Sequence, residues 1–439
     1  MEEQKGRITV VFGPNGSGKS QYAEKLRRQM ASDRVRYLAF SDAYGPATDK
    51  AYYLQLRWNQ HDIDQETPLV ADLLNKAYQL SGEDTTERRQ QRDELYAMFD
   101  MQPLLDKYVI LLSSGELRKF QLIKTLLALP HTLILDNPFI GLDALTRQQL
   151  HDLLLRLARE QGLHLYLLLS KSDDMPDYAN EIIRMGESAP YSTPSRLQEL
   201  LQLPTPNSSL LTPNSPVIDM HHVSIRYGNR TIINDLNWQV RNGERWSLSG
   251  RNGSGKSTLL SLVCADNPQS YACDITLFGR QRGSGESIWE IKRHIGYVSP
   301  EMHRSYQRDL PAINVVASGL KDTVGLYVRP NAEEKEICRW WMRLFGIEEL
   351  AERSFLRLSS GEQRMVLVAR AFVKDPELLI LDEPLHGLDD NNRQLVRHII
   401  DTFCQRPGKT LVMVTHYEEE LPSCIDHHLH LDRIPEVSL

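Results

Sequence analysis

The stretch GRNGSGKST at residues 250–258 follows a short apolar run and opens a leucine-rich segment. This order indicates a buried strand, a glycine loop and the start of a helix. In such a loop the backbone N–H groups converge, and the helix N-terminus adds partial positive charge. Lys256 would reach the phosphates of a nucleotide, and the Ser257 hydroxyl would bind Mg²⁺. The stretch therefore predicts a nucleoside triphosphate site; the weaker alternative is a simple glycine turn before an amphipathic helix.

The same pattern recurs as GPNGSGKS at residues 13–20, so the chain is a tandem repeat. Three further motifs follow each loop in the same order. They are LSSGE at 112–116 and 358–362, LILD at 133–136 and 379–382, and GLD at 141–143 and 387–389. An apolar run that ends in a carboxylate, as at Asp136 and Asp382, is typical of a buried parallel strand that supplies a ligand to Mg²⁺.

The length of 439 residues suits two domains better than one core. Prolines among serines and threonines mark a linker between the copies. We expect an α/β chain of two P-loop NTPase domains in tandem, at 1–190 and 217–439, joined by a Pro-rich linker at 191–216. Each domain should have a mixed sheet with a parallel core and a helical subdomain.

The composition narrows the setting of the protein. A net charge of −7 gives no strong sign of a nucleic-acid surface, and five cysteines with neither metal nor disulfide spacing fit a reducing compartment. No secretory signal is recognisable, and no apolar run is long enough to span a membrane. We expect a cytoplasmic protein whose contact with the inner face of a membrane would go through a partner.

Tyr227 precedes the second phosphate loop, in a segment whose alternating apolar positions over 217–249 predict an antiparallel pair of strands. Its ring could stack on a nucleotide base. The first loop comes too early in the sequence for an equivalent aromatic. Its adenine contact is therefore missing or comes from elsewhere.

Both halves resemble ATP-binding cassette (ABC) ATPase domains, which carry a phosphate loop, the LSSGE signature, the LILD strand, the GLD loop and a terminal switch residue in this order. More narrowly, IINDLNWQV, ITLFGRQRGSGESIWEIKRHIGYVS and EPLHGLD resemble the tandem ModF/PhrA group of molybdenum-transport or photorepair ATP-binding proteins. The resemblance implies an ATPase that uses ATP and Mg²⁺.

The resemblance also implies that the two halves pair head to tail within the chain, so that the phosphate loop of one faces the signature of the other. In the first site, ATP contacts would come from Gly13, Asn15, Gly16, Gly18, Lys19, Ser20, Asn137 and Lys171, with Ser359, Ser360, Gly361 and Glu362. In the second, they would come from Tyr227, Gly250, Asn252, Gly253, Gly255, Lys256, Ser257 and Thr258, with Ser113, Ser114, Gly115 and Glu116. The loop residues Asp143 and Asp389 complete the set, and Mg²⁺ would be held by Ser20 and Asp136 or by Ser257 and Asp382.

The two sites differ in the residues on which hydrolysis depends. Hydrolysis needs a group that deprotonates the attacking water and a donor that stabilises the charge at the γ-phosphate. Glu383 and His416, with Lys256, supply both in the second site. Asn137 cannot accept a proton, and Lys171 replaces the histidine, so the first site should bind ATP and turn it over poorly. The alternative is that Asn137 is a neutral replacement in a site whose base lies elsewhere.

Three functional classes stay open: the ATPase of a membrane permease for an oxyanion such as molybdate, a twin cassette acting on nucleic acid or ribosomes, and a nucleotide-dependent regulator. Transport cassettes carry a glutamine that senses Mg²⁺ and the membrane subunit. The corresponding stretches YLAFSD at 37–42 and YVSPEM at 297–302 have none, although Asp42 or Glu301 could approach the metal. The short linker, with Arg196 as its one base, argues against the ribosome class.

Overall fold

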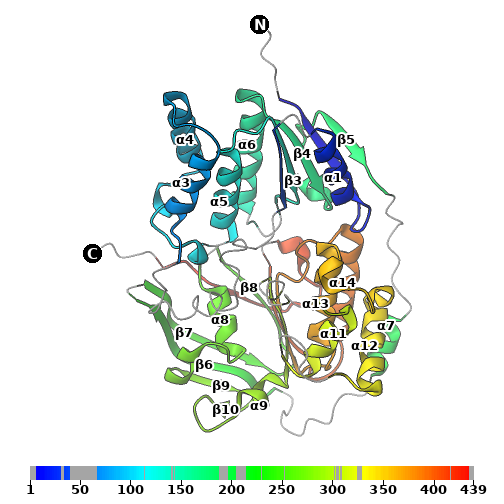
Figure 1. The fold of residues 1–439 in the computed structure, drawn as a ribbon. Helices are drawn as coiled ribbons and strands as arrows, with labels where there is room; N and C mark the ends of the chain where they lie inside the picture. Colours follow the sequence, from blue (N-terminus) through cyan, green and yellow to red (C-terminus); the bar gives the residue numbers. More distant parts are fainter. Residues whose placement is uncertain are drawn as a thin grey trace. The chain divides into compact units, whose positions relative to one another are not determined.

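The computed structural model describes residues 6–30, 34–39, 67–112, 114–139, 142, 144–186, 196–203, 214–228, 230–251, 253–300, 302, 306, 309–323, 329–415 and 417–434 (Figure 1). The chain divides into two compact units, Met1–Ser188 and Ala189–Leu439. Each unit is an α/β fold around a parallel sheet, which confirms the predicted α/β fold class. Over the described strands this sheet is parallel throughout rather than mixed, and the antiparallel strands of the second unit form a sheet of their own.

The sheet of the first unit is five-stranded and parallel, in the order β2-β3-β4-β1-β5. Both faces are covered, so its central strands are continuous apolar runs. Its strands are β1 (Ile8–Phe12), β2 (Val35–Ala39), β3 (Thr132–Asp136), β4 (His164–Leu169) and β5 (Glu181–Arg184).

Alternate residues of these strands enter two separate cores, because successive side chains of a strand point to opposite faces. Leu133 and Leu135 pack with the helices on one face, whereas Ile134 packs with Ala23 of α1 (Lys19–Gln29) on the other. Figure 1 shows α1 and α5 on opposite sides of β3. The helices of the first core are α3 (Val70–Leu80), α4 (Thr86–Met98), α5 (Ser114–Leu126) and α6 (Ala144–Glu160).

The sheet of the second unit has the equivalent strand order, β11-β12-β13-β8-β14, and is also parallel. The tandem repeat in the sequence is therefore a repeat of topology. Its strands are β8 (Arg245–Ser249), β11 (Ile295–Val298), β12 (Leu378–Asp382), β13 (Thr410–Val414) and β14 (His427–His430).

A second sheet, with the order β10-β9-β6-β7, belongs to this unit alone among the described residues. Its strands β6 and β7 form the predicted antiparallel pair. The sheet packs on α8 (Lys256–Val263) through an apolar core that includes Trp238 and Leu260. The strands are β6 (Pro216–Tyr227), β7 (Arg230–Arg241), β9 (Asp274–Leu277) and β10 (Arg280–Gln281).

The opposite face of the second parallel sheet carries helices around an aromatic core. The ring centroid of Phe372 lies 5.6 Å from that of Trp341 and 5.1 Å from that of Phe403. The helices on this face are α11 (Ala312–Ala317), α12 (Ala332–Leu344), α13 (Ser360–Phe372) and α14 (Asp390–Cys404). The short helix α9 (Ile288–Lys292) lies beside β11, and its Ile291 packs in the core shared with the second sheet.

Part of the range expected to be a linker is packed structure. Residues Leu197–Gln202 form the short helix α7 beside α14, and the side chain of Leu200 is fully buried. Arg406 donates a hydrogen bond to the Leu203 carbonyl, with a distance of 3.5 Å between Nη2 and O. Over the described ranges, no helix is long and apolar enough to cross a bilayer.

Candidate nucleotide-binding sites

The first phosphate loop leads from β1 into α1. The Lys19 ammonium lies within the loop, where Nζ donates to the carbonyls of Gly13 at 2.5 Å and Pro14 at 2.7 Å. Gly18 caps α1 with a left-handed backbone, at a φ of 89°. A Cβ on Gly13 would lie 2.0 Å from the Met185 carbonyl oxygen, so this position admits glycine alone. Asn15, Gly16 and Ser20 lie on the same loop and helix start.

The second loop repeats this arrangement between β8 and α8. Lys256 Nζ donates to the carbonyls of Gly250 at 2.6 Å and Arg251 at 3.1 Å. A Cβ on Gly250 would lie 2.4 Å from the Leu431 carbonyl oxygen. The loop and the start of α8 also hold Gly253, Gly255, Ser257 and Thr258, whereas Asn252 lies outside the described residues.

The end of β3 brings the two predicted Mg²⁺ ligands of the first unit together. Ser20 Oγ donates to Asp136 Oδ2 at 3.1 Å. Hydroxyl and carboxylate oxygens suit Mg²⁺, which is usually bound by one or two such groups together with the phosphates. Among the described residues, no cluster of three or more His, Cys, Asp or Glu side chains could bind a metal ion by itself. Ser20 and Asp136 fit this mode of binding.

Two further side chains contact this carboxylate. Tyr37 OH on β2 donates to Asp136 Oδ2 at 2.7 Å, and Asn137 Nδ2 donates to Asp136 Oδ1 at 3.1 Å. Burial, followed by the Asp136 charge, raises the pKa of the Tyr37 phenol well above its usual value. The sequence did not single out Tyr37. Its only signal was its position on the strand that pairs with the LILD strand.

The second unit places Asp382 and Glu383 at the end of β12, and the Glu383 N–H donates to the Val414 carbonyl at 2.9 Å. Asn137 and Glu383 share a left-handed backbone, each with a φ of 49°. The side chain of Glu383 contacts His386, with 3.0 Å between Oε2 and Nδ1. Sequence reasoning missed His386, because nothing in EPLHGLD shows that the loop turns back on its own carboxylate.

Arg364 of α13 holds the backbone around these carboxylates. Its buried guanidinium donates to the carbonyls of Ser299 at 3.0 Å, Asp382 at 2.8 Å and Pro384 at 3.2 Å, and also to that of Glu383. This residue was also missed. Its signal was an arginine at the same distance from both LSSGE motifs, at Arg118 and Arg364. Arg118 Nη1 donates to the Pro138 carbonyl at 3.3 Å.

The second signature is a capped helix N-terminus. Ser359 Oγ accepts from the Glu362 N–H at 3.3 Å, and Glu362 Oε2 accepts from the Ser359 N–H at 2.7 Å. Ser360 and Gly361 form the first turn, which points partial positive charge outward. In the first signature, α5 begins at Ser114 and includes Gly115. Glu116 accepts a hydrogen bond from Lys107 Nζ at 2.9 Å. Ser113 lies outside the described residues.

The remaining predicted residues lie at the ends of other elements. Lys171 follows β4 and forms an ion pair with Asp173, with 3.1 Å between Nζ and Oδ2. Asp389 caps α14 and accepts from the Asn392 N–H at 2.9 Å. Asp42, Asp143, Glu301 and His416 lie outside the described residues.

Tyr227 is packed into the core of the second sheet rather than exposed to a ligand. Tyr227 is 8% exposed, and its hydroxyl accepts a hydrogen bond from Asn267 Nδ2 at 3.0 Å. The ring therefore offers little free surface on which a base could stack. This burial does not favour the expectation that the Tyr227 ring stacks on a nucleotide base.

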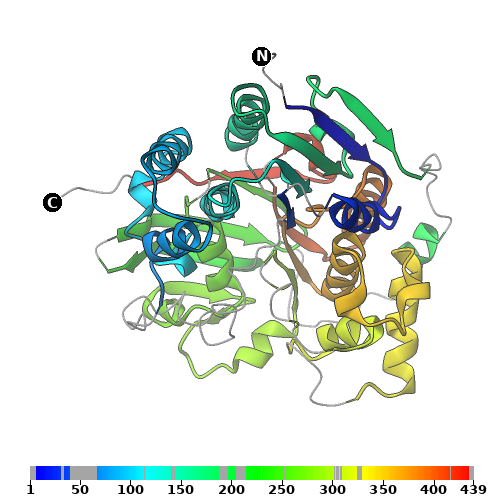
Figure 2. The same ribbon diagram turned by 45° about the horizontal axis from the view of Figure 1, so that its top comes forward.

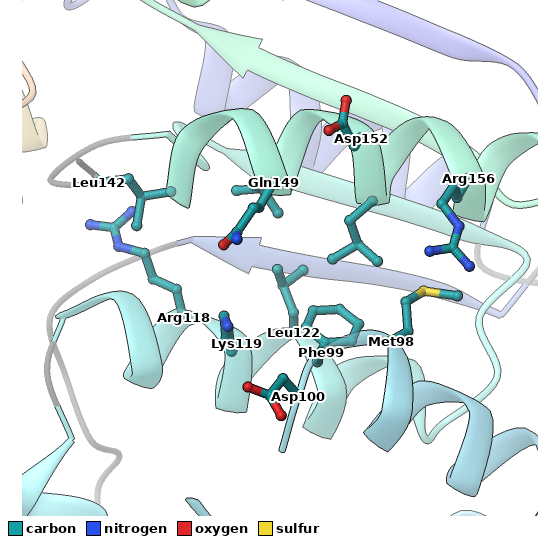
Figure 3. A pocket seen from close by; sticks show the side chains of 12 residues that line it. Met98, Phe99, Asp100, Arg118, Lys119, Leu122, Leu142, Gln149, Asp152 and Arg156 are labelled. Atoms are coloured by element: carbon teal, nitrogen blue, oxygen red, sulfur yellow. The ribbon is translucent and has the colours of Figure 1, made fainter. Parts of the chain in front are cut away.

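A pocket of about 300 Å³ opens between α4, α5 and α6 of the first unit (Figure 3). Gln149 and Asp100 are among its lining residues. Counting from the LSSGE motifs, their counterparts in the second unit are Leu395 and Gly346, and a Cβ on Gly346 would touch Leu395 Cδ2 at 3.8 Å. The lining of this pocket combines leucine and methionine side chains with separate charged groups, and these residues do not form an arrangement typical of a catalytic site.

The comparisons with known proteins agree with this geometry. The model of the ABC transporter family matches residues 1–140 and 233–386. The chain therefore belongs to the ABC transporter family of ATP-binding cassette proteins, and the resemblance to a tandem ABC ATPase is confirmed.

Among its relatives is the ABC transporter ATP-binding protein ModF of Escherichia coli K12, which is 37% identical over 97% of this chain and 91% of its own length. An uncharacterized ABC transporter ATP-binding protein of Schizosaccharomyces pombe is 30% identical over 87% of this chain and 80% of its own.

Two solved structures share the fold over nearly the whole chain. The archaeal ribosome recycling factor aABCE1, in complex with the stalk protein aP1, matches with a TM-score of 0.51 and 17% identity, over 97% of this chain and 83% of its own. A chain from a model of ribosome-bound archaeal Pelota and ABCE1 matches with a TM-score of 0.59 and 17% identity, over 98% of this chain and 74% of its own.

Proposed function

We propose that this protein hydrolyses ATP at the site of Lys256 and Glu383 and holds ATP at the site of Lys19. The observation that carries the proposal is the pair Asn137 and Glu383. Both follow the carboxylate strand with a φ of 49°, so that one backbone geometry presents an amide in the first unit and a carboxylate in the second.

At the second site, the loop N–H groups and Lys256 bind the phosphates and neutralise part of their charge. Ser257 and Asp382 would hold Mg²⁺, which supplies further charge stabilisation when bound. Glu383 accepts the proton of the attacking water, because a carboxylate oxygen has a lone pair that can take up a proton. His416 donates to the γ-phosphate as charge develops there.

At the first site, Ser20 and Asp136 would hold the metal, and Asn137 donates its amide hydrogen to Asp136. An amide has no proton-accepting group of comparable basicity. Asn137 therefore orients the metal ligand Asp136 but provides no base for the attacking water, so ATP at this site stays intact.

We further propose that each site is completed by the signature of the other unit. Ser359, Ser360, Gly361 and Glu362 would face the nucleotide on Lys19, and the signature at 113–116 would face the nucleotide on Lys256. The support is the capped N-terminus of α13, whose first-turn N–H groups suit a phosphate.

The catalytic assignment is tested by Glu383→Gln, with Glu418→Gln as the matched control on an exposed glutamate. We expect Glu383→Gln to lower ATP turnover by about 10²- to 10⁴-fold, the usual contribution of a general base, with ATP binding retained. Glu418→Gln should keep the wild-type rate. Equal rates in the two variants would refute Glu383 as the base.

For the cellular role we propose the cytoplasmic ATPase component of a membrane transport system, in line with its similarity to the ABC transporter ATP-binding protein ModF. A molybdate-like oxyanion as the cargo is what the resemblance to the molybdenum-transport group implies. A twin cassette that works without a permease is the second candidate. It is favoured by residues 297–302, where the glutamine of transport cassettes is replaced and the Ser299 carbonyl is bound by Arg364.

Affinity purification from detergent-solubilised membranes separates these two roles. The transport role predicts a stoichiometric integral-membrane polypeptide that co-purifies with the protein. Purification of the protein without such a polypeptide, with all its ATPase activity in the membrane-free fraction, would favour the second candidate.

A further inference from the structure

We propose that the first site recognises the triphosphate of its ligand but not the base, whereas the second site recognises both the triphosphate and the base. The substrate class of the first site is then any nucleoside triphosphate, with inorganic tripolyphosphate as the minimal ligand. This rests on the proposal above that the loop of Lys19 binds a nucleotide.

In the second unit a hairpin stands directly beside the phosphate loop. A Cβ on Gly255 would lie 2.9 Å from Ile232 Cγ2, and one on Gly253 would lie 3.7 Å from Arg230 Nη2. Arg230 starts β7 and pairs with Tyr227 at the end of β6. A guanidinium plane stacks well on a base, and an isoleucine packs on its edge. Arg230 and Ile232 therefore form a wall that a nucleotide on this loop would touch beyond its phosphates.

This wall is held in place by α8. The seven residues 259–265, from the middle of α8 to just beyond its end, are all buried. Leu259, Leu260 and Leu262 have no exposed surface, and they share one core with the strands β6, β7 and β9. The base wall thus depends on an apolar helix surface that anchors the second sheet.

The described part of the first unit has no such apolar helix surface. Counting from the loop lysines, the counterparts of Leu262, Cys264 and Ala265 are Lys25, Arg27 and Arg28, and all three are exposed. Glu24 forms ion pairs with Arg27 at 2.9 Å and Arg28 at 3.1 Å. A sheet on this surface would remove three cations and one carboxylate from water, which is unfavourable. The outer surface of α1 is therefore built to face solvent.

The surroundings of the first loop agree with this view. Among the described residues, a Cβ on Gly16 would meet nothing within 4 Å, and one on Gly18 would meet only Gln21 Oε1 at 3.9 Å and Met185 Cε at 4.0 Å. Among the described residues of this unit, none occupies the positions that Arg230 and Ile232 take beside the second loop. The loop, Lys19 and Ser20 can bind phosphates, while the base would extend past the described groups.

The test uses the full-length protein in two variants, each with one working loop. Lys256→Ala retains the first loop, and Lys19→Ala retains the second. Affinities for the Mg²⁺ complexes of ATP, GTP, CTP and tripolyphosphate are measured by competition against labelled ATP, after circular dichroism has shown both variants to be folded. We expect Lys256→Ala protein to bind the three nucleotides within about threefold of one another and to bind tripolyphosphate. Lys19→Ala protein should prefer ATP to CTP by about tenfold or more, which is the factor that 1.4 kcal/mol represents.

A tenfold preference for one base in Lys256→Ala protein would overturn the inference and leave the nucleotide site itself standing. Loss of all triphosphate binding in that variant, with full binding in Lys19→Ala protein, would overturn the proposed first site and this inference with it.

A second comparison tests the wall directly. Adding Arg230→Ala and Ile232→Ala to Lys19→Ala protein should reduce its ATP preference to about threefold or less. Arg241→Ala, at the far end of β7, is the matched control and should leave the preference unchanged. An undiminished preference in the wall variant would refute the role of Arg230 and Ile232.

Discussion

Asn137 and Glu383 follow equivalent buried strands with the same left-handed φ of 49°. Their side chains differ, since Asn137 ends in an amide and Glu383, which is one methylene longer, ends in a carboxylate. The amide nitrogen of Asn137 donates to Asp136, whereas the carboxylate of Glu383 contacts His386. A carboxylate can remove a proton from water and an amide cannot. The proposed division of labour between the two sites therefore begins at one residue position.

Glycine is required where the second loop passes the end of β14. Gly250→Ala would place its Cβ against the Leu431 carbonyl, at a φ of 146°. We expect the second unit to lose about 3 kcal/mol of unfolding free energy, from overpacking and backbone strain together. Urea unfolding followed by tryptophan fluorescence reports this, because Trp238 and Trp246 lie in the same unit.

Gly285→Ala is the matched control. Its φ is 99°, but its Cβ would meet no described residue within 4 Å, so backbone strain alone should cost about 1 kcal/mol. Equal losses in both variants would mean that the close approach to Leu431 does not constrain the loop.

Residue types and their order predicted the phosphate loops, the carboxylate strands and the signatures. They could not predict the contacts of Tyr37, His386 and Arg364, because each depends on which strands and loops become neighbours after folding. The burial of Tyr227 has the same cause, since its hydroxyl partner Asn267 lies far along the chain.

At the scale of elements, α1 and α8 begin with the same loop and then differ in their outer surfaces. The sequence of α8 is apolar on both sides because it lies between two sheets, whereas the apolar side of α1 faces the strands β1, β2, β3 and β4 of its own sheet. The phosphate-loop motifs predicted where these two helices begin, and the repeat predicted two domains of the same fold. The helix α7 could not be predicted, because a six-residue helix in a proline-rich stretch is stabilised by its packing on α14 rather than by its own propensity.

The pocket of the first unit gives a prediction at this scale. Gln149→Leu introduces the residue that the second unit carries at the equivalent position, and it should raise the stability of the first unit by about 0.5–2 kcal/mol through cavity filling. Thermal unfolding checks this. Gln148→Leu, on the same helix but outside the pocket lining, should give no gain, and a gain of equal size there would count against filling as the cause.

At the scale of the whole molecule, two units with equivalent strand order carry unequal machinery. The proposed crossed pairing predicts that a carboxylate in one signature damages the site of the other unit. Gly115→Asp should therefore abolish most hydrolysis, because it sets a negative charge against the γ-phosphate of the nucleotide on Lys256. Gly361→Asp should be milder, since it faces the nucleotide on Lys19.

Single-turnover hydrolysis at saturating ATP distinguishes the two glycine variants. If Gly361→Asp abolishes hydrolysis while Gly115→Asp retains it, each site is completed within its own unit or the catalytic assignment is reversed.

The most direct test of the unequal sites is to follow the fate of bound ATP labelled on its γ-phosphate, in protein separated rapidly from free nucleotide. We expect two nucleotides per chain, of which one loses its label in a single turnover and the other stays intact through a long chase. Release of both labels at the same rate would contradict the account, because it would show that Asn137 and Lys171 do not impair the first site.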